Sequence, residues 1–320
     1  MTRAIAGFVA SVFLFPSAAA LAQDVNIAFP VPDLERMLTS DPFTIVSAEI
    51  SRPKAKGDIT LKAEISFGDQ PPIRVKLRKA EPGADSFNNV PRYDLAAYEL
   101  QKLFLDPGEY VVPPTSLRMV PLEEFKRYSP DVKPTFRGAD QVLGVMQYWL
   151  QDVKVIEDVY NAQRFESDPV YARHIGQLNI FTDLIDHRDS NVGNFLISRA
   201  SEGARVFSID NGVAFASEDS DRGELWKDLR VKRLPADAVA RLRKITKESL
   251  TDALAVVAQW QLQDGKYVPV PKGPNLAPGQ GVRQKDGVVQ MGLKSLEISR
   301  IWRNLGNLLE KVDEGELTTF

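Results

Sequence analysis

The chain contains no cysteine, only two histidines, and no strong excess of charge of either sign. Without cysteine it cannot be stabilised by disulfides, so it depends on a hydrophobic core, which 320 residues are enough to form. The formal net charge of −3 argues against a general nucleic-acid-binding protein, which would normally be basic. His174 and His187 lie too far apart for a two-histidine metal motif on one helix, which argues against such a site.

Long hydrophobic runs are also absent beyond the first residues, so no later segment is expected to cross a membrane. The N-terminus has the pattern of a secretory signal peptide, with Arg3, an apolar run over 5–15, Pro16 and a small-residue cleavage site at 20–22. An uncleaved membrane anchor is the alternative, but the apolar run is shorter than the roughly 20 residues of a membrane span. We therefore expect residues 1–22 to be removed and the protein to be exported to a bacterial periplasm or the medium.

The residue pattern predicts an α+β fold in two parts after an extended segment at 23–42. Residues 43–150 read as an antiparallel β lobe with one helix, and 151–320 as a larger, mainly helical lobe. Period-two alternation and turn residues predict the strands of the first part, and helical periodicity predicts its helix. The expected strands are 43–51, 58–68, 72–80, 110–112 and 142–150, and the expected helix is 92–105, with a proline- and charge-rich excursion at 113–140.

The second part is expected to begin with a long amphipathic helix that leads into a β-hairpin. A helix-rich stretch, a loop rich in proline and glycine, and a final helix are expected to follow. In order, these elements are the helix at 168–185, the hairpin strands at 195–197 and 206–209, the helical stretch at 235–261, the loop at 267–287 and the helix at 293–312.

The most informative segment of the chain begins with His187-Arg188-Asp189, followed by Asn194 and then by Asp210 in an Asp-Asn-Gly turn. The first part matches the H-R-D-x-x-x-x-N spacing of a kinase catalytic loop at each fixed position. Phosphoryl transfer needs one carboxylate to orient the attacking hydroxyl, and an amide oxygen and a second carboxylate to hold metal ions. Each residue alone could be an ordinary turn residue. Together and in this order they predict Asp189 as catalytic base and Asn194 and Asp210 as metal ligands.

A cation that holds the nucleotide phosphates is expected on the strand at 72–80. Alternation places Lys76 on the same face as Arg74 and Arg78. Lys76 is the first candidate, although Arg78 or Lys79 could serve, and the strand could instead carry an ordinary solvated basic face. Residues 51–58, where a phosphate-binding loop is expected, contain only one glycine and therefore support such a loop weakly.

Such a cation usually pairs with a carboxylate on the helix behind its strand. Asp94 and Glu99 are both available on the helix at 92–105, on opposite borders of its apolar face. The helical pattern does not choose between them.

With these residues identified, the chain resembles the protein-kinase-like fold. It is similar to the atypical branch that contains the phosphoinositide kinases and the secretory-pathway kinases of the Golgi casein-kinase type. The resemblance covers roughly residues 45–215 and is carried by VKLRKA (75–80), DLAAYELQKLF (94–104), VPPTSLRMV (112–120) and DNGVAF (210–215).

The resemblance implies a two-lobed kinase-like fold with a nucleotide between the lobes. It favours Asp94 over Glu99, because the acidic-x-Ala-Ala-aromatic pattern of the family falls on Asp94. It further implies ATP or another nucleoside triphosphate with its adenine near Met146, Gln147 and Tyr148, phosphates held by Lys76, and Mg²⁺ or Mn²⁺. The chain departs from the family in its catalytic loop, which is closer to ordinary kinases, and in its lack of disulfides.

The expected activity is transfer of the γ-phosphate of a nucleotide to a hydroxyl of a protein or glycan. Two alternatives remain open from the sequence. One is a nucleotide-binding pseudokinase or interaction domain, because ATP is scarce outside the cytoplasm. The other is AMP transfer on the same fold, with the nucleotide reversed and its γ-phosphate held by basic groups such as Lys54, Lys56 or Arg78.

Overall fold

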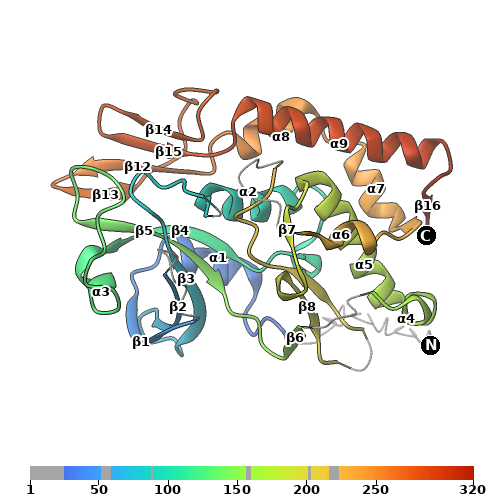
Figure 1. Ribbon diagram of the computed structural model, residues 1–320, viewed down its shortest axis with the longest axis horizontal. Helices are drawn as coiled ribbons and strands as arrows, with labels where there is room; N and C mark the ends of the chain where they lie inside the picture. Colours follow the sequence, from blue (N-terminus) through green and yellow to red (C-terminus); the bar gives the residue numbers. More distant parts are fainter. Residues whose placement is uncertain (1–24, 52–58, 88, 156–159, 201–202, 216–222) are drawn as a thin grey trace, which may run out of the picture.

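The computed structural model describes residues 25–51, 59–87, 89–155, 160–200, 203–215 and 223–320 (Figure 1). The expected signal peptide at 1–22 and most of the expected phosphate loop at 51–58 lie outside these residues. The architecture is α+β, as expected, with a five-stranded antiparallel sheet on the N-terminal side and helices beyond it. Within the described residues, no helix is both long enough and apolar enough to span a bilayer.

The N-terminal sheet has the strand order β1-β2-β3-β5-β4, and every neighbouring pair is antiparallel. The three strands expected between residues 43 and 80 are confirmed. The strands are β1 (Thr44–Ile50), β2 (Thr60–Ser66), β3 (Ile73–Lys79), β4 (Thr115–Pro121) and β5 (Gln141–Tyr148).

One expected strand was wrong. Residues 110–112 do not join the sheet, and the missing strand is β4, which lies in the segment expected to be an excursion. The reason is that the polar backbone groups at 110–112 are satisfied elsewhere. The side chain of Gln101 accepts from the Val112 N–H at 2.8 Å and donates to the Val112 carbonyl at 2.9 Å, and the Val111 carbonyl accepts from Ser208 N–H. Helix α3 (Leu122–Lys126) also lies in the supposed excursion.

The N-terminal extension contributes helix α1 (Val31–Thr39), which covers the apolar face of the sheet. Leu34, Met37 and Leu38 of α1 are buried, consistent with helical spacing of apolar residues. They pack in one cluster with the apolar face of the sheet, which includes Leu61, Ala63, Ile65, Ile73, Val75, Leu77 and Met146. The opposite face of the sheet is left for polar side chains.

Helix α2 (Pro91–Gln101) begins one residue before the expected start and ends four residues earlier than expected. Residues 102–105 continue as turns before the 3₁₀ turn at Pro107–Glu109. The helix is buried nearly all round, because it packs between the N-terminal sheet and the helices of the second part. Its polar residues Arg92, Asp94 and Gln101 are therefore buried and need partners.

The expected long helix of the second part is confirmed as α5 (Pro169–Ile185), with the side chain of Asp168 capping its N-terminus. Asp186 ends it in a left-handed conformation with φ of +47°. The expected hairpin is also present, and it pairs with β6 in a three-stranded sheet. The elements of this region are β6 (Val153–Val155), α4 (Ala162–Ser167), β7 (Asp189–Ser190), a 3₁₀ turn (Val192–Asn194), β8 (Phe195–Ser198), β9 (Val206–Ser208), β10 (Gly223–Glu224), α6 (Leu225–Asp228) and β11 (Arg233–Leu234).

The C-terminal region contains a four-stranded antiparallel sheet that was not expected. The loop expected at 267–287 holds two of its strands, and the helical stretch expected at 235–261 ends in a third. These strands are short and lie between prolines and glycines, which is why the sequence pattern predicted a loop. The elements are α7 (Ala236–Leu242), α8 (Lys247–Leu254), β12 (Ala258–Gln263), β13 (Lys266–Pro269), β14 (Val282–Lys285), β15 (Val288–Met291), α9 (Ser295–Asp313) and β16 (Thr318–Thr319).

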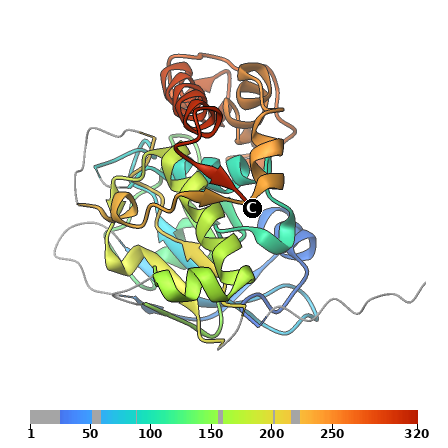
Figure 2. The ribbon, with the colours of Figure 1, turned by 90° about the vertical axis from the view of Figure 1, so that its right-hand side faces the viewer.

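The C-terminal helices and strands form a layer along one edge of the molecule in both views (Figures 1 and 2). This layer is joined to α2 through a buried ion pair. Arg92 donates to the two carboxylate oxygens of Glu297 on α9 at 2.7 and 3.0 Å, and Tyr93 donates its hydroxyl to the same carboxylate. Both charged side chains are almost fully buried. The pair therefore fixes α2 against the C-terminal layer.

Glu297→Ala would remove the acceptor of several buried hydrogen bonds but would leave Arg92 paired with Asp85 at 2.7 Å, so the buried charge stays partly compensated. We expect the substitution to lower the free energy of unfolding by about 2–3 kcal/mol in urea titrations. Glu310→Ala is the matched control, because Glu310 is exposed on the same helix. Equal, small effects of the two substitutions would contradict the role given to Glu297.

Candidate functional site

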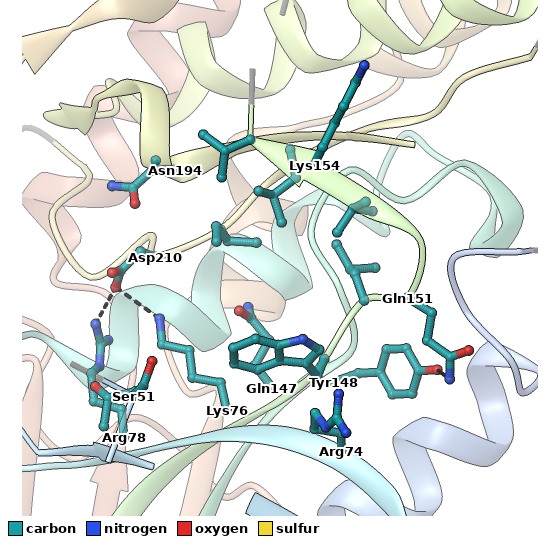
Figure 3. A pocket seen from close by; sticks show the side chains of 18 of the residues that line it. Ser51, Arg74, Lys76, Arg78, Gln147, Tyr148, Gln151, Lys154, Asn194 and Asp210 are labelled. Atoms are coloured by element: carbon teal, nitrogen blue, oxygen red, sulfur yellow. Dashed lines mark hydrogen bonds and ion pairs between the residues drawn. The ribbon is translucent and has the colours of Figure 1, made fainter. Parts of the chain in front are cut away.

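A cavity of about 1140 Å³ lies between the polar face of the N-terminal sheet and the β8–β9 hairpin. It extends along the link between the two parts, from Gln147 to Val155. Four of the predicted site residues line it together, from segments more than a hundred residues apart in the sequence: Lys76, Asp189, Asn194 and Asp210. Figure 3 shows Asp210 facing Lys76 and Arg78, with Asn194 on the other side of Asp210.

Asp210 is placed by the turn that follows β9. Its backbone has φ of +60°, in the left-handed region that Asp tolerates better than most residues. The carboxylate Oδ1 lies 3.2 Å from Lys76 Nζ and 2.5 Å from Arg78 Nη1. The preceding Ile209 N–H donates to the Asn194 carbonyl at 2.9 Å, so the same backbone contact also positions Asn194. Lys76 and Arg78 thus both contact the Asp210 carboxylate, directly after the end of β9.

Arg78 also forms an ion pair with Asp94 of α2, and both side chains are almost fully buried. Burial raises the pKa of the Asp94 carboxyl, and the positive charge of Arg78 opposes that shift. The Asn211 backbone N–H also donates to Asp94. Arg78 therefore bridges Asp94 and Asp210, which joins β3, α2 and the Asp-Asn-Gly turn.

The structure separates the candidates that the sequence left open. Asp94, and not Glu99, lies behind the site, because Glu99 pairs instead with Lys102 at 2.8 Å. Lys79 pairs with Glu81 at 2.7 Å and does not line the cavity. Lys76 lies on the face predicted from alternation and lines the cavity, but Arg78 is the residue that pairs with Asp94. Lys76 thus pairs with Asp210 at the cavity, whereas Arg78 joins the Asp94 and Asp210 carboxylates.

Gly212 is required by this arrangement. A Cβ atom at this position would lie 2.8 Å from Arg78 Nη2 and 3.3 Å from Asp94 Oδ2. Any side chain would therefore push apart the buried ion pair. The glycine of the Asp-Asn-Gly turn allows the turn to approach α2 closely.

The residues of the predicted catalytic loop are held by short-range hydrogen bonds. Asp189 lies in β7, which pairs in parallel with β10. The Asn191 side chain donates to Asp189 Oδ1 at 2.9 Å, and the Asn194 side chain donates to the Asp189 carbonyl oxygen. The side-chain nitrogen of Asn194 is therefore engaged in a hydrogen bond within the loop. Asn191 was missed by sequence reasoning because its position in H-R-D-x-x-x-x-N is variable.

His187 is fully buried beneath this loop and has a supporting role. Its Nδ1 accepts a hydrogen bond from the Asp189 N–H at 3.2 Å, and its ring packs against Phe195. Burial lowers the pKa of His187 to about 4, so the ring is neutral at pH 7. A neutral ring is required for Nδ1 to accept that hydrogen bond. Arg188, the middle residue of the motif, lies 3.7 Å from Asp186.

The residues expected near an adenine occupy different environments. Gln147 and Tyr148 line the cavity, whereas Met146 is fully buried in the core beneath the sheet. The Gln147 side chain donates to Thr115 Oγ1 at 2.9 Å. Alternation along β5 accounts for the difference, since Met146 and Gln147 point to opposite faces.

Sequence reasoning missed several other residues that line the cavity. Arg74 and Trp149 lie on the polar face of the sheet, and Phe29 reaches the cavity from the N-terminal extension. Arg74 could have been found, because its alternation with Lys76 was already apparent. Phe29 could not, because its approach depends on how the extension folds back.

The donor set fits a divalent cation held partly by substrate. Asn194 and Asp210 offer an amide oxygen and a carboxylate on one wall of the cavity. No group of three or more His, Cys, Asp or Glu side chains forms a metal cluster in the part of the chain that the structure describes. Mg²⁺ does not require such a cluster, since it is commonly bound by one or two carboxylates together with substrate phosphates.

No known protein family matches the sequence, and no curated protein is significantly similar to it.

Lys76 and Arg78, the two β3 residues that pair with Asp210, are expected to differ in how much their substitution lowers the free energy of unfolding. Arg78→Met leaves the Asp94 carboxylate buried without its partner, and we expect a loss of about 3–5 kcal/mol in the free energy of unfolding. Lys76→Met removes only an ion pair to the partly exposed Asp210, which is expected to cost at most about 1 kcal/mol. Urea titration of both variants measures the difference. A larger loss for Lys76→Met would contradict the assignment of Arg78 as the structural cation.

Stability is expected to fall on acidification because His187 is buried in its neutral form. Between the unfolded pKa of about 6.5 and the folded pKa of about 4, only the unfolded chain binds the proton, so stability rises with pH across this window. Between pH 7 and pH 5 this single group is expected to account for about 2 kcal/mol.

The measurement is the free energy of unfolding of wild type and His187→Gln at both pH values. His174, whose pKa burial lowers to about 3, contributes equally to both proteins and cancels in the comparison. Wild type should lose about 2 kcal/mol more than the variant on acidification. An identical pH dependence of the two proteins would show that His187 is not buried neutral.

Proposed function

We propose that the protein is a kinase-like phosphotransferase that moves the γ-phosphate of a nucleoside triphosphate to a hydroxyl of a protein or glycan. The observation that carries the proposal is that Lys76, Asp189, Asn194 and Asp210 line one cavity. The order of the last three along the chain matches the requirements of phosphoryl transfer. Because residues 1–22 have the pattern of a signal peptide, we also propose that the reaction takes place outside the cytoplasm.

In the proposed reaction, each residue has a role that follows from its position. Lys76 would hold phosphate oxygens, and Asn194 and Asp210 would hold Mg²⁺ or Mn²⁺, whose charge would offset that of the phosphates. Asp189, oriented by Asn191, aligns the acceptor hydroxyl for in-line attack on the γ-phosphorus and takes its proton late in the step. The bond from the γ-phosphorus to the acceptor oxygen forms as the bond to the β–γ bridging oxygen breaks, and the nucleoside diphosphate leaves. Most of the rate acceleration comes from positioning and from neutralisation of charge.

Arg78 and Asp94 act indirectly in this scheme. They hold the Asp-Asn-Gly turn against α2, so the position of Asp210 depends on a buried ion pair. Lys76 Nζ lies 3.2 Å from Asp210 Oδ1. Nucleotide binding would exchange this contact for contacts of Lys76 to phosphate and of Asp210 to the metal ion.

The first test is the melting temperature with ADP or ATP, with and without Mg²⁺ or Mn²⁺. A ligand that binds only the folded state adds about 2.7 kcal/mol of stability at a hundredfold excess over its Kd. We expect an upward shift that requires the metal ion and disappears in Asp210→Asn. Asp264→Asn is the matched control, because Asp264 is exposed and its backbone also has positive φ, at +47°. The absence of any metal-dependent shift in wild type would overturn the proposal.

Labelled nucleotide separates phosphate transfer from AMP transfer. Phosphate transfer incorporates label from the γ-phosphate of ATP into the acceptor, and AMP transfer incorporates label only from the α-phosphate. We expect γ-label, because Arg78, one of the three cations considered for the reversed nucleotide, is already paired with two carboxylates. Lys54 and Lys56, the other cations considered, lie outside the described residues.

A further inference from the structure

The polar face of the N-terminal sheet forms one wall of the cavity. Residues directly opposite each other in antiparallel strands point to the same face, and the register places Lys62, Lys76 and Gln147 in one row. The neighbouring row contains Glu64, Arg74 and Trp149, because the Trp149 N–H donates to the Arg74 carbonyl at 2.9 Å and continues the ladder. Trp149 therefore brings a large aromatic ring to an otherwise polar surface.

The indole of Trp149 lies across the sheet. Lys62 Nζ on β2 is 5.5 Å from the centroid of the ring, although Trp149 itself is next to β3. The Lys62 side chain and the indole therefore approach each other across β3. Trp149 is only partly buried and lines the cavity, so part of its surface faces the open space.

The wall of the cavity that faces the N-terminal sheet includes apolar side chains. Leu196 of β8 and Ile209, directly before Asp210, are partly buried and line it. A flat group could lie between the indole and these side chains. Trp149 and Gln147 are two residues apart, about 7 Å along a strand, and Gln147 is paired with Lys76. This separation suits a ribose between a base at Trp149 and phosphates at Lys76.

Three of the five backbone N–H groups at 148–152, in the link between the two parts, already donate to other backbone groups. The Tyr148 N–H donates to the Pro114 carbonyl at 2.8 Å, and the Trp149 N–H is used by Arg74. The Gln151 N–H donates to the Asn26 carbonyl at 3.0 Å, while the Asn26 side chain donates to the Gln151 carbonyl at 2.9 Å. Hydrogen bonds from these positions to a base would require breaking existing ones.

On the basis of the proposed nucleotide-binding function, we propose that Trp149 is the platform on which the nucleobase stacks. The base is then recognised by its flat face and not by the donors and acceptors on its edge. Stacking on an aromatic ring is tolerant of base identity because every base has a π-face. The site is therefore expected to take adenine and guanine nucleotides alike.

The test is titration calorimetry of ADP and GDP, each with Mg²⁺, against wild type, Trp149→Ala and Trp149→Phe. We expect similar Kd values for ADP and GDP in wild type. Trp149→Ala should weaken both by the same factor, about 5- to 150-fold, the range observed for loss of one stacked base. Trp149→Phe should retain most of the affinity, because a phenyl ring still offers a stacking surface.

Trp302→Ala is the control, because Trp302 is partly exposed on α9, in the C-terminal layer and outside the cavity lining. Quenching of tryptophan fluorescence by ADP, present in wild type and lost in Trp149→Phe, would locate the base directly at the ring.

The outcomes separate the two proposals. Nucleotide binding by wild type with unchanged affinity in Trp149→Ala would overturn the stacking role and leave the proposed function standing. A preference of about tenfold or more for one base in wild type, the scale of a single hydrogen bond, would show recognition of the edge and overturn the inference as well. Failure of wild type to bind either nucleotide would overturn both proposals.

Discussion

The buried bridge of Arg78 between Asp94 and Asp210 is the interaction on which the candidate site depends. It joins a strand of the N-terminal sheet, helix α2 and the turn after β9, three segments that are distant in sequence. A buried charge is costly unless it is paired, and Arg78 supplies that pairing for Asp94. There is no room for a Cβ atom at position 212 beside the pair. The turn can therefore approach α2 this closely only because residue 212 is glycine. The same bridge that stabilises the fold also positions Asp210 at the cavity.

Helix α2 connects this bridge to the rest of the molecule. Asp94 faces the site, while Arg92 and Tyr93, two residues and one residue before it, bind Glu297 on the C-terminal helix. The helix is therefore fixed on both sides by buried polar contacts, which are directional, and not only by apolar packing. This arrangement limits rotation of α2 about its axis, and rotation would move Asp94. The C-terminal layer thus contributes to the geometry of a site that it does not line.

The two faces of the N-terminal sheet differ: one packs in the hydrophobic core and the other lines the cavity. One face packs on α1 and holds the core, whereas the other carries Arg74, Lys76, Arg78 and Trp149 toward the cavity. Alternation along β3 makes this division possible, because Arg74, Lys76 and Arg78, which turn away from the core, turn toward the cavity. A shift of register by one residue would exchange the two faces and bury the cations.

Much of this organisation follows from the sequence by itself. Alternation predicted strands β1, β2, β3 and β5 and the face that carries Lys76. The H-R-D-x-x-x-x-N spacing singled out the loop whose Asp189 and Asn194 line the cavity, and the Asp-Asn-Gly turn predicted the placement of Asp210 after a strand. These features depend on neighbours within a few residues, which local pattern reports reliably. The helical pattern left Asp94 and Glu99 open and only the family resemblance favoured Asp94; the tertiary structure shows that Asp94 lies behind the site. Only the tertiary structure decided that Arg78 is its partner and that residues 258–291 contain a sheet and not a loop. Those outcomes depend on contacts between distant segments, where packing and the pairing of buried charges outweigh local preference.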